Sequence, residues 1–398
     1  MKVCLITPWL LNYPPTTGGE TLIWTTAFSL TDLNHNVFMF TYDTTREFEG
    51  IHEGIPVIAI KAKPDFSLIH RPWLIPFYFS NMIKQLRGIS NILLSTSIYY
   101  DNLFNNYLER LDCDLIQLEF VGIIPPYKQI LLIKRKKNIP VVVHLHDIFS
   151  LYMMDEGYDA LLDKFAIRQL FTYELTYLRE VDFVITVSRR DERLLRAYGL
   201  RNVNTILPSV SPKLLNCRKS CEYVEKYEPF ILVPVAHRDK RNVLKCTYEL
   251  ALLLPEINFI VTGTNMRDFK NILGNIKIPN NLKLMGTLPY YYLNDLYSRC
   301  LAVFCPAISR TGTFMRIIEA SLHNKIVITT RSGASSVEGL NYEGILIGEN
   351  IFSFKKLIEN ITRYHHQIKT DPALLYNEMV KEMNELYKRL HELLKIRV

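Results

Sequence analysis

The sequence predicts an α/β protein with two domains, each built on a parallel sheet. Short apolar runs rich in β-branched residues alternate with longer helical stretches, which is typical of βα units. The alternation stops at residues 209–229, a polar and charged segment, and then starts again. A chain of 398 residues suggests two or three domains, and this single interruption favours two.

The first half of the chain contains a series of strand candidates, each a short apolar run. They are residues 2–7, 36–42, 56–60, 115–118, 141–144, 183–187 and 205–207. Helix candidates between them include residues 20–33, 162–178 and 189–199, the last of which ends at a glycine, a common helix C-terminus.

The second half repeats this pattern after the interruption. Its strand candidates are residues 230–233, 259–261, 282–285, 303–305, 326–329 and 345–347, and its helix candidates include residues 242–254 and 292–299. Residues 373–395 form one long charged helix at the end of the chain. We therefore expect a first domain over 1–208, a linker over 209–229, a second domain over 230–370 and a C-terminal helical segment over 371–398.

Composition and charge favour an anionic partner, such as a nucleotide, a lipid head group or a nucleic acid. Lys and Arg number 47 against 40 for Asp and Glu, which gives a net charge of +7. This surplus is small for the length and no recognition motif appears, so nucleic-acid binding is disfavoured. Met1 leads straight into a strand and no run of 18 apolar residues occurs, which predicts a cytoplasmic protein without a signal peptide.

Metal binding is not expected. The seven cysteines have neither disulfide-scaffold nor structural-zinc spacing. Asp112-Cys113-Asp114 has the D-x-D pattern of some metal–diphosphate sites, but it precedes a strand and so lies at the wrong end of the sheet. We interpret it as the turn that enters the strand.

Two motifs of the first half lie where parallel strands end. Gly18 and Gly19 come between the first strand and a helix, where the backbone can approach an anion, although a plain turn is the alternative. His144 and His146 end a buried strand, and alternation places both on one side. Either ring could donate a hydrogen bond to a sugar or phosphate oxygen. The alternative is a histidine satisfied by the loop backbone.

Two motifs of the second half carry cations next to strand ends. Arg238, Lys240 and Arg241 suit a diphosphate, with a solvated loop as the alternative. Gly312 and Thr313 belong to a small-residue loop that leads into a helix and suits a phosphate. On that helix Arg316 and Glu319 share a face, so an anion-binding cation lies beside an acid suited to a ribose diol. A local ion pair is the alternative there.

Seven stretches, in this order and spacing, resemble the GT-B glycosyltransferases of the retaining family 4. No single stretch is specific, but together they cover nearly the whole chain. They are residues 17–20, 114–119, 143–147, 181–188, 206–209, 284–288 and 312–320.

The resemblance implies two Rossmann-like domains facing across a cleft, with a last helix that packs back on the first domain. It implies that the second domain holds most of a nucleotide-sugar donor. Residue by residue, Glu319 resembles the acid that binds the ribose hydroxyls, and Arg316 a basic position of one subgroup. Gly18 and Gly19 would approach the donor phosphates or the acceptor, and His146 resembles the histidine near the transferred sugar. Gly286 and Thr287 lie in the turn that resembles the base-contacting one.

Three positions depart from the family pattern. Thr311 stands where the first acid of the family's E-x7-E pair usually sits, eight residues before Glu319. Ala236-His237 replaces the usual Gly-Arg after the first strand of the second domain, and Asn242 replaces the usual lysine.

The expected activity is sugar transfer from a UDP- or GDP-sugar with retention of configuration and no metal or other cofactor. Basic side chains and helix N-termini would stabilise the leaving diphosphate. The acceptor is a sugar, a lipid-linked molecule or a protein. Residues 61–88 are basic and aromatic, and with the cations of residues 134–137 they suit a peripheral contact with anionic lipid. A core-facing helix is the alternative for that stretch.

Thr311 also motivates a reading without catalysis, in which the chain binds sugar nucleotides or acts as a scaffold on the same fold. An epimerase or phosphorylase of the same fold is a weaker third reading.

Overall fold

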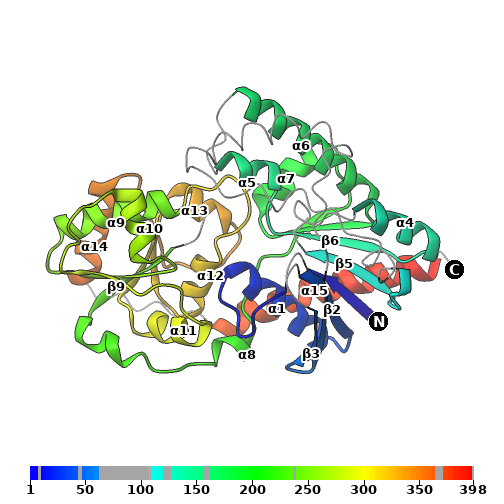
Figure 1. Cartoon of the computed structure of the whole chain (residues 1–398), viewed down its shortest axis with the longest axis horizontal. Helices are drawn as coiled ribbons and strands as arrows, with labels where there is room; N and C mark the ends of the chain where they lie inside the picture. The colour runs from blue at the N-terminus through cyan, green and yellow to red at the C-terminus, as the bar shows by residue number, and fades with distance from the viewer. Residues whose placement is uncertain are drawn as a thin grey trace. The chain divides into compact units, whose positions relative to one another are not determined.

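A computed structural model describes residues 1–7, 10–43, 47–61, 107, 109–119, 127–155, 161–235, 239–363 and 371–396 (Figure 1). By its internal contacts the chain forms two compact units. The first unit comprises Met1–Leu11, Thr26–Ile206 and Glu382–Val398, and the second comprises Asn12–Thr25 and Leu207–Lys381.

An eight-stranded sheet forms the centre of the first unit, in the order β3-β4-β2-β1-β5-β6-β7-β8. In the described part of the chain its neighbouring strands pair in parallel, except for the antiparallel pair β3 and β4. The strands are β1 (Lys2–Ile6), β2 (Asn36–Asp43), β3 (Phe48–His52), β4 (Ile55–Lys61), β5 (Leu115–Glu119), β6 (Val141–Leu145), β7 (Phe183–Thr186) and β8 (Val203–Thr205).

Helices pack on this sheet through their apolar faces. They are α4 (Tyr127–Lys137), α5 (Phe149–Asp155), α6 (Leu161–Glu180) and α7 (Arg189–Ala197). A single buried cluster joins β1, β5, β6 and β7 with α4, α6 and α7, so the apolar strands that define the sequence pattern form the core. The Ser188 side chain caps α7 by accepting the backbone N–H of Asp191.

The second unit contains a six-stranded parallel sheet in the order β11-β10-β9-β12-β13-β14. Its strands are β9 (Phe230–Pro234), β10 (Asn258–Thr262), β11 (Leu282–Leu284), β12 (Ala302–Cys305), β13 (Ile326–Thr329) and β14 (Ile345–Ile347). Its helices are α8 (Pro212–Leu215), the 3₁₀ helix η5 (Glu222–Tyr227), α9 (Lys240–Leu253), α10 (Met266–Leu273), α11 (Tyr290–Arg299), α12 (Met315–Leu322), α13 (Arg331–Ser336) and α14 (Ile351–Arg363).

Two helices contain residues of both units. Helix α1 (Gly18–Asp32) begins in the second unit and continues into the first from Thr26. Helix α15 (Pro372–Ile396) belongs to the second unit up to Lys381 and to the first from Glu382. Within the first unit, the buried Tyr387 of α15 donates its hydroxyl hydrogen to the Gln117 side chain on β5.

The predicted fold class is confirmed, since two doubly wound parallel sheets follow one another along the chain. Every expected strand is present, although β8 begins and ends two residues earlier than expected. Strand β3 was not expected: it forms a hairpin with β4 through Glu53 and Gly54, both of which have positive φ.

The predicted domain boundaries stay predictions, because the compact units combine segments that are far apart in sequence. The expected linker over 209–229 lies in the second unit and contains α8 and η5, while residues 12–25 of the first half also lie in the second unit. Among the described residues, no helix combines the length and the apolar composition needed to span a membrane.

Candidate functional site

The first unit gathers a carboxylate and two imidazoles at the carboxyl edge of its sheet. The strand order reverses between β1 and β5, the position where open α/β sheets bind ligands. Glu119 ends β5 and is the register partner of His144 on β6, so both side chains leave the sheet on the same side. His146 follows two residues later, just beyond the last residue of β6.

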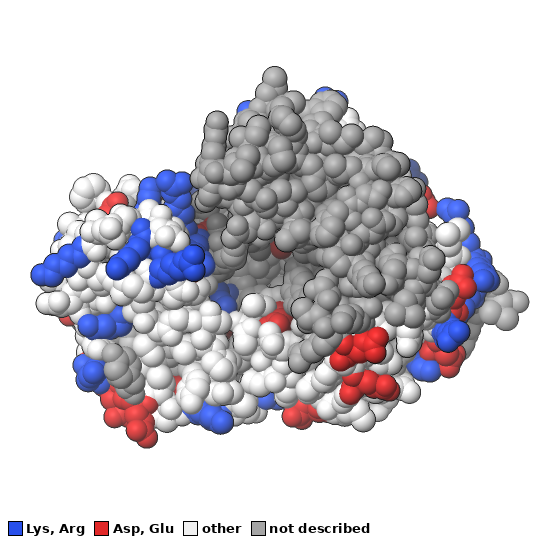
Figure 2. All heavy atoms as spheres, in the orientation of Figure 1, with Lys and Arg blue, Asp and Glu red and all other residues white. Residues whose placement is uncertain are grey.

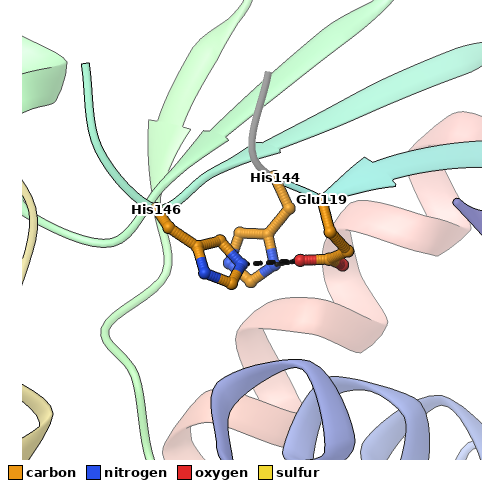
Figure 3. Close-up of side chains that lie close together, drawn as sticks. All are labelled: Glu119, His144 and His146. Atoms are coloured by element: carbon orange, nitrogen blue, oxygen red, sulfur yellow. Dashed lines mark hydrogen bonds and ion pairs between the residues drawn. The ribbon is translucent and has the colours of Figure 1, made fainter. Parts of the chain in front are cut away.

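Figure 3 shows both imidazole rings directed at the Glu119 carboxylate. His146 Nε2 lies 2.6 Å from Glu119 Oε2 in a hydrogen bond. His144 Nδ1 lies 3.0 Å from the same oxygen, an ion-pair contact that is not aligned as a hydrogen bond. All three side chains are buried. The sequence alternation that placed His144 and His146 on one side is therefore present, and Glu119 is the group that they share.

Glu119 is ionised in this cluster. Burial alone would raise the pKa of Glu119, but the two histidines more than offset this and hold it well below its ordinary value. Burial lowers the pKa of His146, which opposes its hydrogen bond to Glu119. An ionised Glu119 thus accepts the Nε2 hydrogen of a neutral His146, whose Nδ1 is then the unprotonated nitrogen. In this neutral ring Nδ1 carries no hydrogen, so His146 can accept a hydrogen bond from a ligand at Nδ1 but cannot donate one there.

Two imidazoles and a carboxylate are also ligands that Zn²⁺ accepts, and their ligand atoms lie within 4.8 Å of one another. In a tetrahedral zinc site neighbouring ligand atoms are about 3.3 Å apart. The two contacts to Glu119 Oε2, at 2.6 and 3.0 Å, are shorter. The geometry is that of a hydrogen-bonded cluster, and the predicted independence from metal stays a prediction.

Glu174 holds the segment that follows His146. Its carboxylate lies on α6 and accepts the backbone N–H groups of Phe149 at 2.7 Å and of Ser150 at 3.0 Å, the first two residues of α5. Burial raises the pKa of Glu174 to about 7, against the lowering effect of these hydrogen bonds. Sequence reasoning missed Glu174, because an acid within a long helix is normally a solvated one.

In the second unit the predicted pair Arg316 and Glu319 lies on α12. Arg316 Nη1 is 2.9 Å from Glu319 Oε2, so the local ion pair considered above is formed. The Tyr297 hydroxyl donates to the same oxygen at 2.8 Å. The other oxygen of Glu319, Oε1, is buried and has no hydrogen-bond partner among the described residues. It therefore has the capacity to accept a hydroxyl group.

Burial and charge pairing together set the protonation of Arg316 and Tyr297. Burial opposes the positive charge of Arg316, but Glu319 raises the pKa of the guanidinium above its ordinary value. Burial raises the pKa of the Tyr297 phenol well above its usual range, with the Glu319 charge acting in the same direction. The tyrosine hydroxyl is thus a permanent donor to Glu319.

Gly18 lies against the start of α12 within the second unit. A Cβ placed on Gly18 would be 3.0 Å from the Met315 Cβ, so a larger residue here would have to displace Met315 by a few tenths of an ångström. The nearby turn is shaped by Glu20, whose carboxylate accepts hydrogen bonds from Asn12, Thr16 and Thr17. The structure thus brings Gly18 to the helix that carries Arg316, which is almost 300 residues away in sequence.

The remaining predicted glycines and threonines lie in the second unit, and all of them except Gly19 lie on loops. Gly312 has φ +70° and precedes Thr313, which donates its hydroxyl to Ser336 O at 2.9 Å and so anchors the loop before α12. Gly19 is the second residue of α1. Gly286 accepts the backbone N–H of Gly263 after β10, and Thr287 beside it is exposed.

The cations predicted to bind the diphosphate differ in whether they are already paired with an acidic side chain. Lys240 Nζ pairs with Asp268 at 2.8 Å, whereas Arg241 on the same turn of α9 is exposed. Arg238 lies outside the described residues. Figure 2 shows Lys and Arg side chains gathered on one face of the second unit, in the region of α9, α10 and α13. Of the predicted set, Arg241 is the described cation with an exposed side chain.

The basic run of α4 is engaged within the first unit. Lys134 lies 3.0 Å from Asp182, and Arg135 pairs with Glu180 at 2.9 Å. Lys136 lies 3.6 Å from Glu109, and Lys137 donates to the Leu111 carbonyl at 2.8 Å. These partners reduce the charge that the run offers to a lipid surface. Apart from Lys61, the predicted lipid-binding stretch 61–88 lies outside the described residues.

Known structures resemble this chain over its full length. Sucrose-phosphate synthase from Thermosynechococcus elongatus has a TM-score of 0.67 at 16% identity, covering 98% of this chain and 99% of that chain. HepE from Anabaena, solved with UDP and glucose, has a TM-score of 0.64 at 14% identity, covering 98% and 99%. Trehalose-6-phosphate synthase from Burkholderia multivorans has a TM-score of 0.60 at 8% identity, covering all of both chains. At these identities the likeness establishes the fold.

Family assignment comes from the sequence. No curated protein matches the chain. A scan against protein families matches residues 16–213 to Glycosyltransferase Family 4. That range includes Gly18, Gly19, Glu119 and both histidines of the cluster. The resemblance expected from the seven sequence stretches is thereby confirmed, and the chain belongs to glycosyltransferase family 4, with the GT-B fold of two Rossmann-like units.

Proposed function

We propose that the chain transfers a sugar from a UDP- or GDP-sugar to an acceptor hydroxyl, with retention of configuration and without a metal ion. The observation that carries the proposal is Glu319, a buried carboxylate with one oxygen engaged by Arg316 and Tyr297 and the other without a described partner. A ribose diol supplies the hydroxyl donors that such an oxygen accepts. The UDP bound in the HepE structure supports a nucleoside diphosphate as ligand.

The second unit would bind the donor nucleotide. Glu319 would accept the ribose hydroxyls, while the turn at Gly286 and Thr287 would contact the base. The closely packed start of α1 at Gly18 and Gly19, and the loop at Gly312 and Thr313, would bring backbone N–H groups to the diphosphate. Arg238, Lys240 and Arg241 would add positive charge, so that the leaving diphosphate is stabilised electrostatically.

The first unit would contact the transferred sugar through His146. In its neutral form, with Nε2–H donated to Glu119, the ring can accept a sugar hydroxyl at Nδ1. This contact would orient the sugar while the bond to the diphosphate breaks, and no protein nucleophile is required. The positive charge that develops on the sugar would be favoured by the nearby ionised Glu119.

A donor panel tests this proposal. The chain would be incubated with UDP-glucose, UDP-galactose, UDP-N-acetylglucosamine and GDP-mannose, with and without EDTA, and release of UDP or GDP would be measured. We expect turnover of at least one donor that EDTA leaves unchanged and that His146→Ala and Glu319→Gln reduce. The exposed Lys245→Ala is the matched control. Wild-type rates in both variants would refute the assignment of these residues.

A non-catalytic sugar-nucleotide-binding protein is the second candidate, and one observation favours it. Thr311, at the position of a family acid, is buried and its backbone is engaged with Ser309. A binder would show an increased unfolding temperature with a sugar nucleotide and no turnover in the same panel.

We also propose that the protein is cytoplasmic and that residues 61–88 make a peripheral contact with anionic lipid, where a lipid-linked acceptor would lie. Flotation with liposomes tests it. Lys84→Gln combined with Arg87→Gln should reduce flotation with anionic vesicles, whereas Arg135→Gln combined with Lys136→Gln should not, because these side chains already have acidic partners. Equal flotation of neutral and anionic vesicles would contradict the proposal.

A further inference from the structure

We propose that Tyr387, Gln117 and Glu119 form a buried hydrogen-bond relay through which the C-terminal helix α15 positions His146 and sets its protonation. The inference rests on the proposed function, in which His146 contacts the transferred sugar. Tyr387, Gln117 and Glu119 are positioning residues in this scheme, because they act on the sugar through His146.

The relay is continuous from α15 to the imidazole. The Tyr387 hydroxyl donates to Gln117 Oε1. Gln117 Nε2 donates to Glu119 Oε1 at 2.7 Å, and Glu119 Oε2 accepts from His146 Nε2 at 2.6 Å. The chain of contacts joins residues 270 positions apart in sequence and lies within the first unit.

The relay has a defined direction. An ionised Glu119 accepts hydrogen bonds only, so the Gln117 amide must present its NH₂ group to Glu119. Its carbonyl oxygen then faces Tyr387, whose hydroxyl must donate. Rotating the amide by 180° would place its oxygen against the carboxylate, a repulsive contact in a low dielectric. Each member therefore restricts the next, and the last restricted group is the His146 ring.

The relay is shielded from water, which strengthens each link. Gln117 and Glu119 are 0% exposed, Tyr387 is 1% exposed and His146 is 5% exposed. Burial, together with the Glu119 charge, raises the pKa of Tyr387 well above its usual range, so its phenol keeps its hydrogen. Apolar side chains would pack α15 on the sheet equally well. Packing alone therefore does not explain why the relay consists of buried polar groups.

Other titratable groups face the relay and also affect the pKa of His146. His144 lies beside Glu119, and its proximity lowers the pKa of His146, after the larger effect of burial. Asp147, next to His146 in sequence, acts in the opposite direction. On the side of Tyr387, the His35 ring lies 5.6 Å away between ring centroids. None of these groups replaces the carboxylate that links Gln117 to His146.

The relay predicts opposite shifts in two variants. In Glu119→Gln the charge that favours the imidazolium is lost, so the pKa of His146 should fall. In Tyr387→Phe the Gln117 amide loses its anchor and donates less well to Glu119. The carboxylate then becomes more basic toward His146, and the pKa of His146 should rise by about half a unit.

Nitrogen NMR of the imidazole rings measures this without any turnover. The His146 signal would be identified by its absence in His146→Gln and followed from pH 4 to pH 9 in each variant. Gln117→Met removes both links and should raise the midpoint like Tyr387→Phe, which keeps the test available if one variant does not fold. Tyr342→Phe is the matched control, because it also removes a buried tyrosine hydroxyl, one bonded to the Lys325 carbonyl at 2.7 Å.

Opposite shifts in Glu119→Gln and Tyr387→Phe, with no shift in Tyr342→Phe, would support the relay. Shifts of the same sign, or an unchanged midpoint and tautomer in both Tyr387→Phe and Gln117→Met, would overturn it. In the donor panel Tyr387→Phe should lower kcat on the order of tenfold and leave the donor KM unchanged. A panel without turnover would refute the proposed function, while the NMR result would still decide the relay.

Discussion

Glu119 and His144 are register partners on the parallel strands β5 and β6, and Glu119 Oε2 lies 3.0 Å from His144 Nδ1. The pairing is a property of the sheet, because parallel neighbours direct paired side chains to the same face. It places the Glu119 carboxylate in contact with both histidines of the H-x-H motif. The cluster at the carboxyl edge thus follows from strand order as much as from the motif.

Replacing Glu174 should change how stability depends on pH. Its pKa is raised to about 7 in the folded chain, so between about pH 4.5 and pH 7 the folded state binds more protons than the unfolded state. Stability from this group is therefore present at low pH and lost as pH rises through 7. The expected loss is on the order of 3 kcal/mol.

Urea unfolding from pH 5 to pH 8 measures this loss. Glu174→Gln should flatten the decline, since the amide does not titrate and resembles the protonated carboxyl group that wild type carries at pH 5. A variant with the slope of wild type would show that Glu174 is not the titrating group.

Gly18→Ala should weaken nucleotide binding. The added Cβ would lie 3.0 Å from the Met315 Cβ, so the starts of α1 and α12 must separate. Titration calorimetry with UDP and GDP measures the effect, for which we expect roughly a tenfold loss of affinity, about 1.4 kcal/mol. Gly199→Ala is the control: it has φ +89° at the end of α7, so it should lower stability by about 1 kcal/mol without changing nucleotide affinity. Equal affinity losses in both variants would indicate general destabilisation.

Arg316→Met should be more destabilising than Glu319→Gln. Removing the guanidinium leaves a fully buried carboxylate without its counter-charge, at a cost of roughly 3–5 kcal/mol. The Arg316 side chain is 14% exposed, so after loss of Glu319 it retains some access to water. The double variant should recover part of the stability in denaturant unfolding. Strictly additive losses would argue against coupling between the two side chains.

The Glu119 cluster should function without metal. Its contacts of 2.6 and 3.0 Å are shorter than the separation of two ligand atoms on one zinc ion, so removing trace metal should leave both structure and activity unchanged. Dialysis against EDTA followed by thermal unfolding and the donor assay checks this. A decrease that Zn²⁺ restores in wild type, but not in Glu119→Gln, would identify a metal site instead.

Several features of the site were accessible to sequence reasoning because they depend on local patterns. His146 stands directly after a buried strand, and Arg316 and Glu319 share one helical face, so spacing alone placed each of them. The acid at the end of β5 was missed as a site residue. The sequence does show a carboxylate at the end of this strand. Its partners could not be predicted, because they depend on which strand lies next to it in the sheet.

The sequence by itself determined the α/β class, the positions of the strands and the polar residues at their ends, because hydrophobic periodicity is a local property of the chain. Only the tertiary structure decided which of those residues meet. It placed Gly18 against Met315 in the second unit, and Tyr387 against Gln117 in the first. These contacts join segments about 300 and 270 residues apart, and they depend on strand order, register and the course of α15, none of which a local pattern contains.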